Sequence, residues 1–135
     1  MLPVEYQLKN KELVKLWVEA LRSGKYQQIV GKLRGPLANG YGYCCLGVLC
    51  EVAKPLMSDR DLSYLEKNLE NGAYPPEIVL EHLIVEGKRD IPISAVGLNE
   101  KLYAVYTLND DLGMTFDQIA DLLEQTHLKG DESIQ

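Results

Sequence analysis

Three cysteines lie within seven residues of one another and are the most reactive side chains in the sequence: Cys44, Cys45 and Cys50. Cys44 follows a Gly-Tyr-Gly-Tyr segment and opens an apolar stretch that we predict to be helical. A helix N-terminus lowers the pKa of a thiol and supplies N–H groups for an oxyanion, as a thiol hydrolase requires. Such an enzyme also needs a histidine base, and His82 is the candidate for it.

The positions of the two histidines argue against this catalytic arrangement. His82 falls in a predicted helix and His127 in a predicted tail, and neither position gives the fixed partner that a thiol nucleophile requires. The cysteines are therefore expected to fill the core as small apolar residues. We favour a protein without enzymatic activity and keep a hydrolase that uses Cys44 and His82 as the alternative.

A metal site built from the same cysteines conflicts with helical geometry. At about 100° per residue, Cys45 and Cys50 point about 140° apart on one helix and cannot both reach a single tetrahedral ion. The run from Asn109 to Gly113 places its side-chain oxygens at adjacent rather than alternate positions, which favours a helix end over a calcium loop. We predict no metal and no cofactor.

A basic segment near the N-terminus is the third group of side chains that could do chemistry. Glycines at positions 31 and 35 flank its end, so backbone N–H groups and cations together could bind an anion or a nucleotide. No phosphate-loop or dinucleotide glycine pattern supports that use. The side chains predicted for this binding site are Arg22, Lys25, Tyr26, Lys32 and Arg34.

The charge is unevenly distributed along the chain. Residues 1–35 hold seven Lys or Arg against three Asp or Glu, whereas residues 90–135 hold two against nine. The net charge of −6 argues against nucleic-acid binding, because phosphates repel an acidic protein. The acidic end could meet a basic partner or simply form solvated surface, and a small-molecule ligand stays open.

Length and composition predict one globular domain over residues 1–135, with residues 129–135 as a frayed tail. A chain of 135 residues with 46% apolar and 25% charged residues is typical of such a domain. The longest uncharged stretch, 35–50, is too short and too polar to span a bilayer. The first residues show no export signal, so a reduced, cytoplasmic protein is expected.

Hydrophobic periodicity predicts a helix from Asn10 to Ser23 and a buried central helix from Cys44 to Lys54. The apolar stripe of the first helix is expected to comprise Leu13, Leu16, Trp17, Ala20 and Leu21. Gly47 weakens the central helix by about 1 kcal/mol, which indicates that another backbone packs closely against it. Between these helices, residues 26–30 and 41–43 could pair as a small hairpin.

Further helices are predicted at 61–69, from Pro75 to Gly87, and at 99–111, with an extended linker over 90–97. A last helix begins after Thr115, which forms a capping box with Gln118. The predicted fold is thus a single compact domain, mainly α, of about five helices with a minor β-hairpin; an α+β fold is the alternative.

Three runs of sequence stand out together: 16–26, 43–51 with its Tyr-Cys-Cys-Leu-Gly string, and 108–122 with its Leu-Asn-Asp start. In this order they resemble a family of small uncharacterised proteins encoded by tailed phages and prophages. The resemblance implies an accessory phage protein acting inside a bacterium, and it supplies no catalytic residues. We therefore expect a small protein that binds and modulates a host or defence component, its partner being a host or phage protein.

Overall fold

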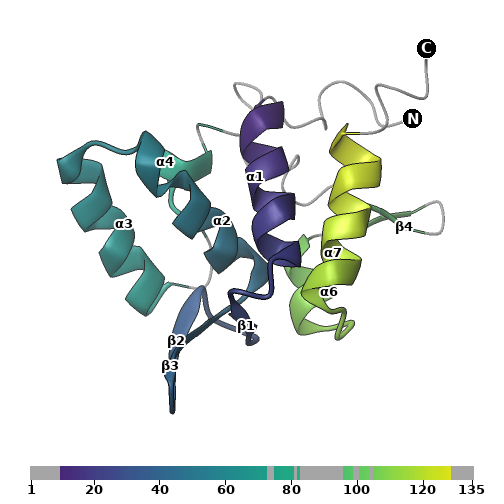
Figure 1. Ribbon diagram of the computed structural model, residues 1–135, viewed down its shortest axis with the longest axis horizontal. Coiled ribbons are helices and arrows are strands. Elements are labelled where there is room, and N and C mark those ends of the chain that lie inside the picture. The colour runs from purple at the N-terminus through teal and green to yellow at the C-terminus, as the bar shows by residue number, and fades with distance from the viewer. Residues whose placement is uncertain are drawn as a thin grey trace.

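Helix α2 lies in the middle of the fold, with α1 and α7 on one side and α3 on the other (Figure 1). The computed structural model describes residues 10–72, 75–80, 82, 96–98, 101–103 and 105–128. Its helices are α1 (Lys11–Arg22), α2 (Cys45–Ala53), α3 (Asp59–Asn71), α4 (Glu77–Leu80), α6 (Val105–Asp110) and α7 (Phe116–Leu123), with a 3₁₀ turn at Lys54–Leu56 and a π turn at Glu124–Leu128. A fold that is mainly α with a minor β part is confirmed.

Helix α1 begins where the sequence predicts, because the Asn10 side chain accepts a hydrogen bond from the Leu13 N–H at 3.1 Å. Its buried stripe differs from the predicted one. Val14 and Val18 are buried, whereas Leu16 is exposed. Valine and leucine are both apolar, so the sequence allows either a stripe that includes Leu16 or a stripe that includes Val14 and Val18. The packing of α2 and α7 against α1 decides which stripe faces the core.

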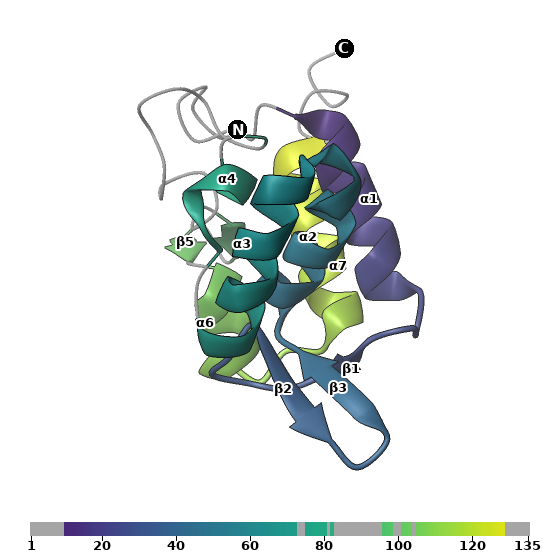
Figure 2. The ribbon, with the colours of Figure 1, turned by 90° about the vertical axis from the view of Figure 1, so that its left-hand side faces the viewer.

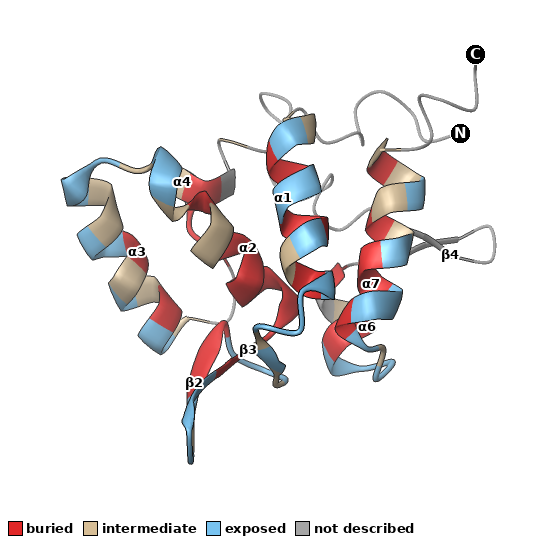
Figure 3. Ribbon diagram, viewed as in Figure 1, coloured by how far each residue is buried: buried red, intermediate tan, exposed pale blue. Residues whose placement is uncertain are grey.

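Helix α2 is buried over most of its circumference, as predicted, and Figure 3 shows it as the most continuously buried helix. The close approach inferred from Gly47 is confirmed, since a Cβ atom there would lie 1.8 Å from the Leu33 carbonyl oxygen. The backbone of Leu33 is fixed in this position by two hydrogen bonds. Its N–H donates to Gly72 O at 3.1 Å, and its carbonyl accepts from Cys44 N at 3.3 Å.

A three-stranded sheet follows α1 in the order β1 (Gln27–Gln28), β3 (Gly40–Tyr43), β2 (Arg34–Leu37). The predicted pairing is wrong in one respect. β3 forms its hairpin with β2, while the segment around β1 pairs with β3 in parallel. A two-residue turn at 38–39 closes the β2–β3 hairpin, and Gly40, the first residue of β3, adopts a φ of 136°. The hairpin projects from the helices (Figure 2).

The C-terminal part corrects one predicted helix and confirms another. The sequence predicts a helix over 99–111, yet Lys101–Tyr103 is strand β5, paired antiparallel with β4 (Val96–Leu98), and α6 spans Val105–Asp110. The capping box of α7 is present: Thr115 Oγ1 accepts from Gln118 N at 3.2 Å, and Gln118 Oε1 accepts from Thr115 N at 2.9 Å. Helix α7 packs along α1.

Helix α3 is longer than the predicted 61–69, because Ser58 caps it by accepting from Asp61 N at 3.2 Å. It buries Leu65 and Leu69 against the core. Helix α4 spans Glu77–Leu80 and follows two prolines, as predicted for the start of this helix. Residues 81 and 83–95, which include the rest of the helix predicted to Gly87 and most of the predicted 90–97 linker, lie outside the described residues, as does the predicted tail at 129–135. No helix among the described residues has the length and apolar character needed to cross a bilayer.

Candidate functional site

The three runs that carry the sequence resemblance meet at Cys45. The Trp17 indole of α1 donates to the Cys45 carbonyl oxygen at 2.8 Å, and the Cys45 N–H donates to Asn109 Oδ1 at 3.3 Å. The Cys45 thiol also lies 3.7 Å from the Val105 carbonyl oxygen of α6, as a weak donor. One residue from each run thus fixes the start of the central helix. These contacts are buried, so their role is structural.

Asn109 is the centre of a buried polar network that also holds the sheet. Its amide nitrogen donates to Ile29 O at 2.9 Å, and its oxygen accepts from Gln28 Nε2 at 2.8 Å. Gln28 in turn accepts from Phe116 N at 3.1 Å and donates to Met114 O at 2.8 Å. The prediction that 109–113 ends a helix is confirmed, because α6 ends at Asp110 and Gly113 adopts a φ of 63°.

The thiols are confirmed as core groups. Cys44, Cys45 and Cys50 are all buried and unbridged. Burial raises the pKa of the Cys44 thiol, and it outweighs the opposite effect of the Leu46 and Gly47 N–H groups at the start of α2. Burial likewise raises the pKa of Cys45 and Cys50. A nucleophilic thiol needs a lowered pKa, so burial works against the activation expected of the helix N-terminus at Cys44.

The histidines occupy different places in the fold. His82 lies in a turn after α4, where its backbone N–H donates to Val79 O at 3.1 Å. His127 is buried in the π turn that continues α7. Within the described ranges, no three His, Cys, Asp or Glu side chains gather as a metal site would require.

The predicted basic site is divided between two ion-pair clusters. Arg22 pairs with Asp121 at 2.6 Å and Glu124 at 3.2 Å, which ties α1 to α7. Arg34 instead pairs with carboxylates of α3, on the other side of α2 (Figure 1). The Lys25 ammonium lies 5.8 Å from the centre of the Tyr26 ring. Because its two arginines are separated and neutralised, the set does not form one anion pocket; binding by Lys25 and Lys32 stays a prediction.

Arg34 is the centre of the larger ion-pair cluster, which we call the Arg34 cluster: Arg34, Glu51, Lys54, Glu66 and Glu70. The guanidinium lies 3.1 Å from Glu66 and 3.4 Å from Glu70, with Glu51 at 3.9 Å. Lys54 pairs with Glu51 at 2.9 Å and also with Glu66. The hydrogen bond from Lys54 lowers the pKa of Glu66 below its ordinary value. With three carboxylates and two cations, the cluster carries a net charge of −1.

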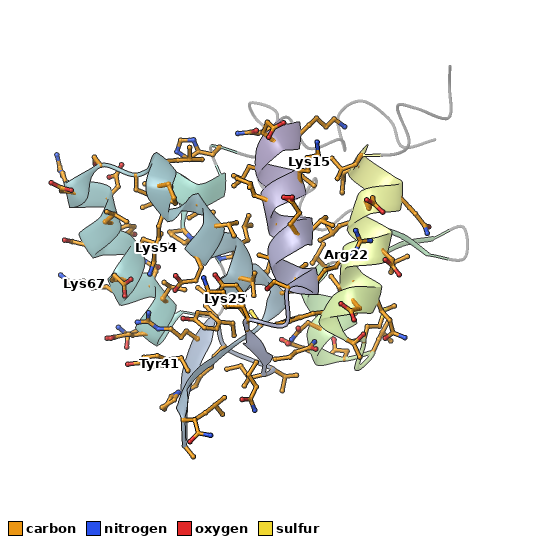
Figure 4. All side chains as sticks on the ribbon, in the orientation of Figure 1. Lys15, Arg22, Lys25, Tyr41, Lys54 and Lys67 are labelled. Carbon is orange, nitrogen blue, oxygen red and sulfur yellow. The ribbon has the colours of Figure 1, made fainter. Side chains whose placement is uncertain are left out.

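The projecting hairpin presents an exposed tyrosine next to this cluster. The Arg34 Cζ atom lies 4.6 Å from the centre of the Tyr41 ring, yet 53% of Tyr41 is exposed. Arg34 itself is only 8% exposed, because carboxylates from two helices hold it. Figure 4 shows Tyr41 and Lys54 on the α3 side of the molecule, away from Arg22. Tyr41 is thus an exposed aromatic ring resting on a fixed guanidinium.

Comparison with known proteins identifies the family to which the chain belongs. Residues 9–127 match a protein-family model described as Domain of unknown function (DUF8296). The chain belongs to this family. The matched range includes both the Cys45 junction and the Arg34 cluster. No curated protein and no solved structure matches the chain.

Most residues of the Arg34 cluster in this DUF8296 family member were not predicted from the sequence. The sequence predicts Arg34 as a free cation and does not indicate Tyr41 or the three glutamates. The usable signal was the four-residue spacing of Glu66 and Glu70, although the helix predicted over 61–69 stops one residue short of Glu70. Their partner lies 32 and 36 residues earlier in the chain, so no local pattern connects them.

Proposed function

We propose that this protein is a small binding protein that docks to a protein component of a bacterial cell and modulates it. The observation that carries the proposal is Tyr41, an exposed ring on a projecting hairpin that rests on the buried Arg34 guanidinium. Tyrosine is enriched among the residues that dominate binding energy at protein interfaces. The surface around Tyr41 therefore has the chemistry of an interface anchor.

The rigidity of this anchor supports the same proposal. Binding through a mobile side chain costs about 0.5–1.5 kcal/mol for its immobilisation. Tyr41 is already ordered, since Arg34 lies over its ring and Glu66 and Glu70 hold Arg34. Binding of a partner over Tyr41 would therefore cost little free energy for immobilising this side chain.

The proposed setting is that of an accessory protein of a phage, in the bacterial cytoplasm. It rests on the resemblance of the three runs to small phage and prophage proteins. In the fold those runs supply Trp17, Cys45 and Asn109, which build the buried junction. The resemblance thus supports a shared architecture, while the exposed hairpin would give each protein its own partner.

The test is capture of partners from bacterial lysate by the immobilised protein and two single variants. Tyr41→Ala should lose the partner without loss of folding, because the ring is exposed. Tyr64→Ala is the matched control, since Tyr64 is 55% exposed on α3 and makes no aromatic contact with another described residue. Tyr64→Ala should retain the partner. Failure to capture any reproducible protein, or equal capture by Tyr41→Ala, would contradict the proposal.

A thiol-alkylation experiment separates this proposal from the hydrolase alternative. Burial raises the pKa of Cys44, so the native protein should react with iodoacetamide at neutral pH far more slowly than the unfolded chain. Fast alkylation of Cys44 in the native protein would instead support the hydrolase alternative.

A further inference from the structure

The exposed charges around Tyr41 determine which kind of partner the hairpin can accept. Both cations of the Arg34 cluster are shielded, Arg34 most of all. Two of the three carboxylates are more accessible than the cations: Glu66 is 44% and Glu70 62% exposed at the side chain, whereas Glu51 is shielded. A molecule that approaches Tyr41 therefore meets carboxylate oxygens, and it meets little of the guanidinium that neutralises them.

Glu70 has spare hydrogen-bonding capacity. Its Oε1 atom accepts from Arg34 at 3.4 Å, which is a long contact, and the described residues provide no partner for its Oε2 atom. A carboxylate accepts several hydrogen bonds, and those from an ionised donor are the strongest. Glu70 can thus accept a charged donor from another molecule without giving up Arg34.

The Tyr41 ring adds an apolar contact beside these oxygens. Arg34 lies over the ring and reduces its attraction for a second cation, so the carboxylates supply most of the electrostatic attraction. The ring can still pack against the methylene groups of an arginine or lysine side chain whose charged end reaches Glu70. An aromatic ring beside exposed carboxylates is therefore complementary to a long basic side chain.

We infer that the surface formed by Tyr41, Glu66 and Glu70 binds an arginine- or lysine-bearing segment of a protein partner. This inference rests on the proposed function and adds the chemistry of the partner. The Arg34 cluster carries a net charge of −1 and the whole chain one of −6, and both charges favour a positively charged partner.

A titration of the ¹⁵N-labelled protein tests the inference with a short glycine–serine peptide that carries arginines. The control peptide replaces each arginine by citrulline, which keeps the shape and removes the charge. The arginine peptide should shift the amide signals of 40–43 and 66–70, and the citrulline peptide should not. Shifts spread evenly over the acidic 105–128 region, or equal binding of the citrulline peptide, would overturn the inference.

Three variants sharpen the test. Glu70→Gln should weaken binding of the arginine peptide by about two- to fivefold, the range of an exposed ion pair. Lys67→Ala removes an exposed competing cation from α3 and should strengthen binding, whereas Tyr64→Ala should leave binding unchanged. Unaltered binding by Glu70→Gln would refute the site. If lysate capture depends on Tyr41 while the arginine peptide does not bind, the proposed function stands and this inference fails.

Discussion

Replacing Gly47 by alanine tests the central packing of the fold, because helix propensity and the structure predict opposite signs. By propensity alone, alanine in the middle of α2 should stabilise the protein by about 1 kcal/mol. In the structure, the added Cβ atom would lie 1.8 Å from Leu33 O and 2.7 Å from Leu33 C. The first distance is 1.2 Å short of the 3.0 Å below which such contacts are essentially never found.

The expected cost follows from what must move to relieve that overlap. Overpacking a core costs about 1–3 kcal/mol, and more when the obstacle is backbone. Leu33 is held by hydrogen bonds to Gly72 and Cys44, and breaking one of them costs about 1 kcal/mol more. After subtraction of the propensity gain of about 1 kcal/mol, Gly47→Ala should lower the free energy of unfolding by about 1–3 kcal/mol.

Urea unfolding followed by far-UV circular dichroism measures this change. Ser63→Ala is the control, since Ser63 is exposed on α3 and the substitution changes propensity without adding a contact. Its effect should stay within about 0.5 kcal/mol. A Gly47→Ala protein as stable as the parent, with the same denaturant dependence, would refute the packing of α2 against Leu33.

Three further predictions concern the core, the polar junction and the ion pairs. Leu49→Ala should cost about 2–5 kcal/mol in thermal melts because it empties a fully buried site, whereas Cys44→Ser should cost about 1 kcal/mol or less; the reverse order would contradict the placement of α2. Asn109→Ala should cost about 2–4 kcal/mol by urea unfolding, since it leaves several buried groups unpaired, and a neutral result would show that the junction is dispensable. The pKa of Glu66 is lowered in the folded protein, so its stabilisation is present above the ordinary value of 4.5 and is lost as pH falls through the lower folded value. The parent should therefore lose stability below about pH 5 more steeply than Glu66→Gln, and parallel pH profiles would exclude the Lys54–Glu66 pair as the cause.

Local chemistry made several elements predictable from the sequence. The start of α1 follows from Asn10, and the start of α7 follows from Thr115 and Gln118, because a cap is formed within one helical turn. The burial of α2 follows from its nearly continuous apolar residues, and its close neighbour follows from Gly47. Each of these signals lies within a few residues of the feature that it predicts.

Tertiary structure decided the features that depend on distant partners. The hairpin partner of β3 was mistaken because β2 contains Arg34, Gly35 and Pro36, which give no strand pattern, and its pairing depends on the turn that follows. The strand at 101–103 was predicted to be helical, because three residues pair with β4 without any periodicity of their own.

The candidate site shows the same division most clearly. The sequence determined that Arg34 and Tyr41 lie close together in the chain and that Glu66 and Glu70 are four residues apart, while the structure extended α3 far enough to include both glutamates on one side of the helix. Only the fold placed that side of α3 against β2 and so converted a predicted free cation into a buried, neutralised one. The physical reason is that the long-range Coulomb partners of a charged side chain are fixed by how helices and strands pack, and packing has no local signature.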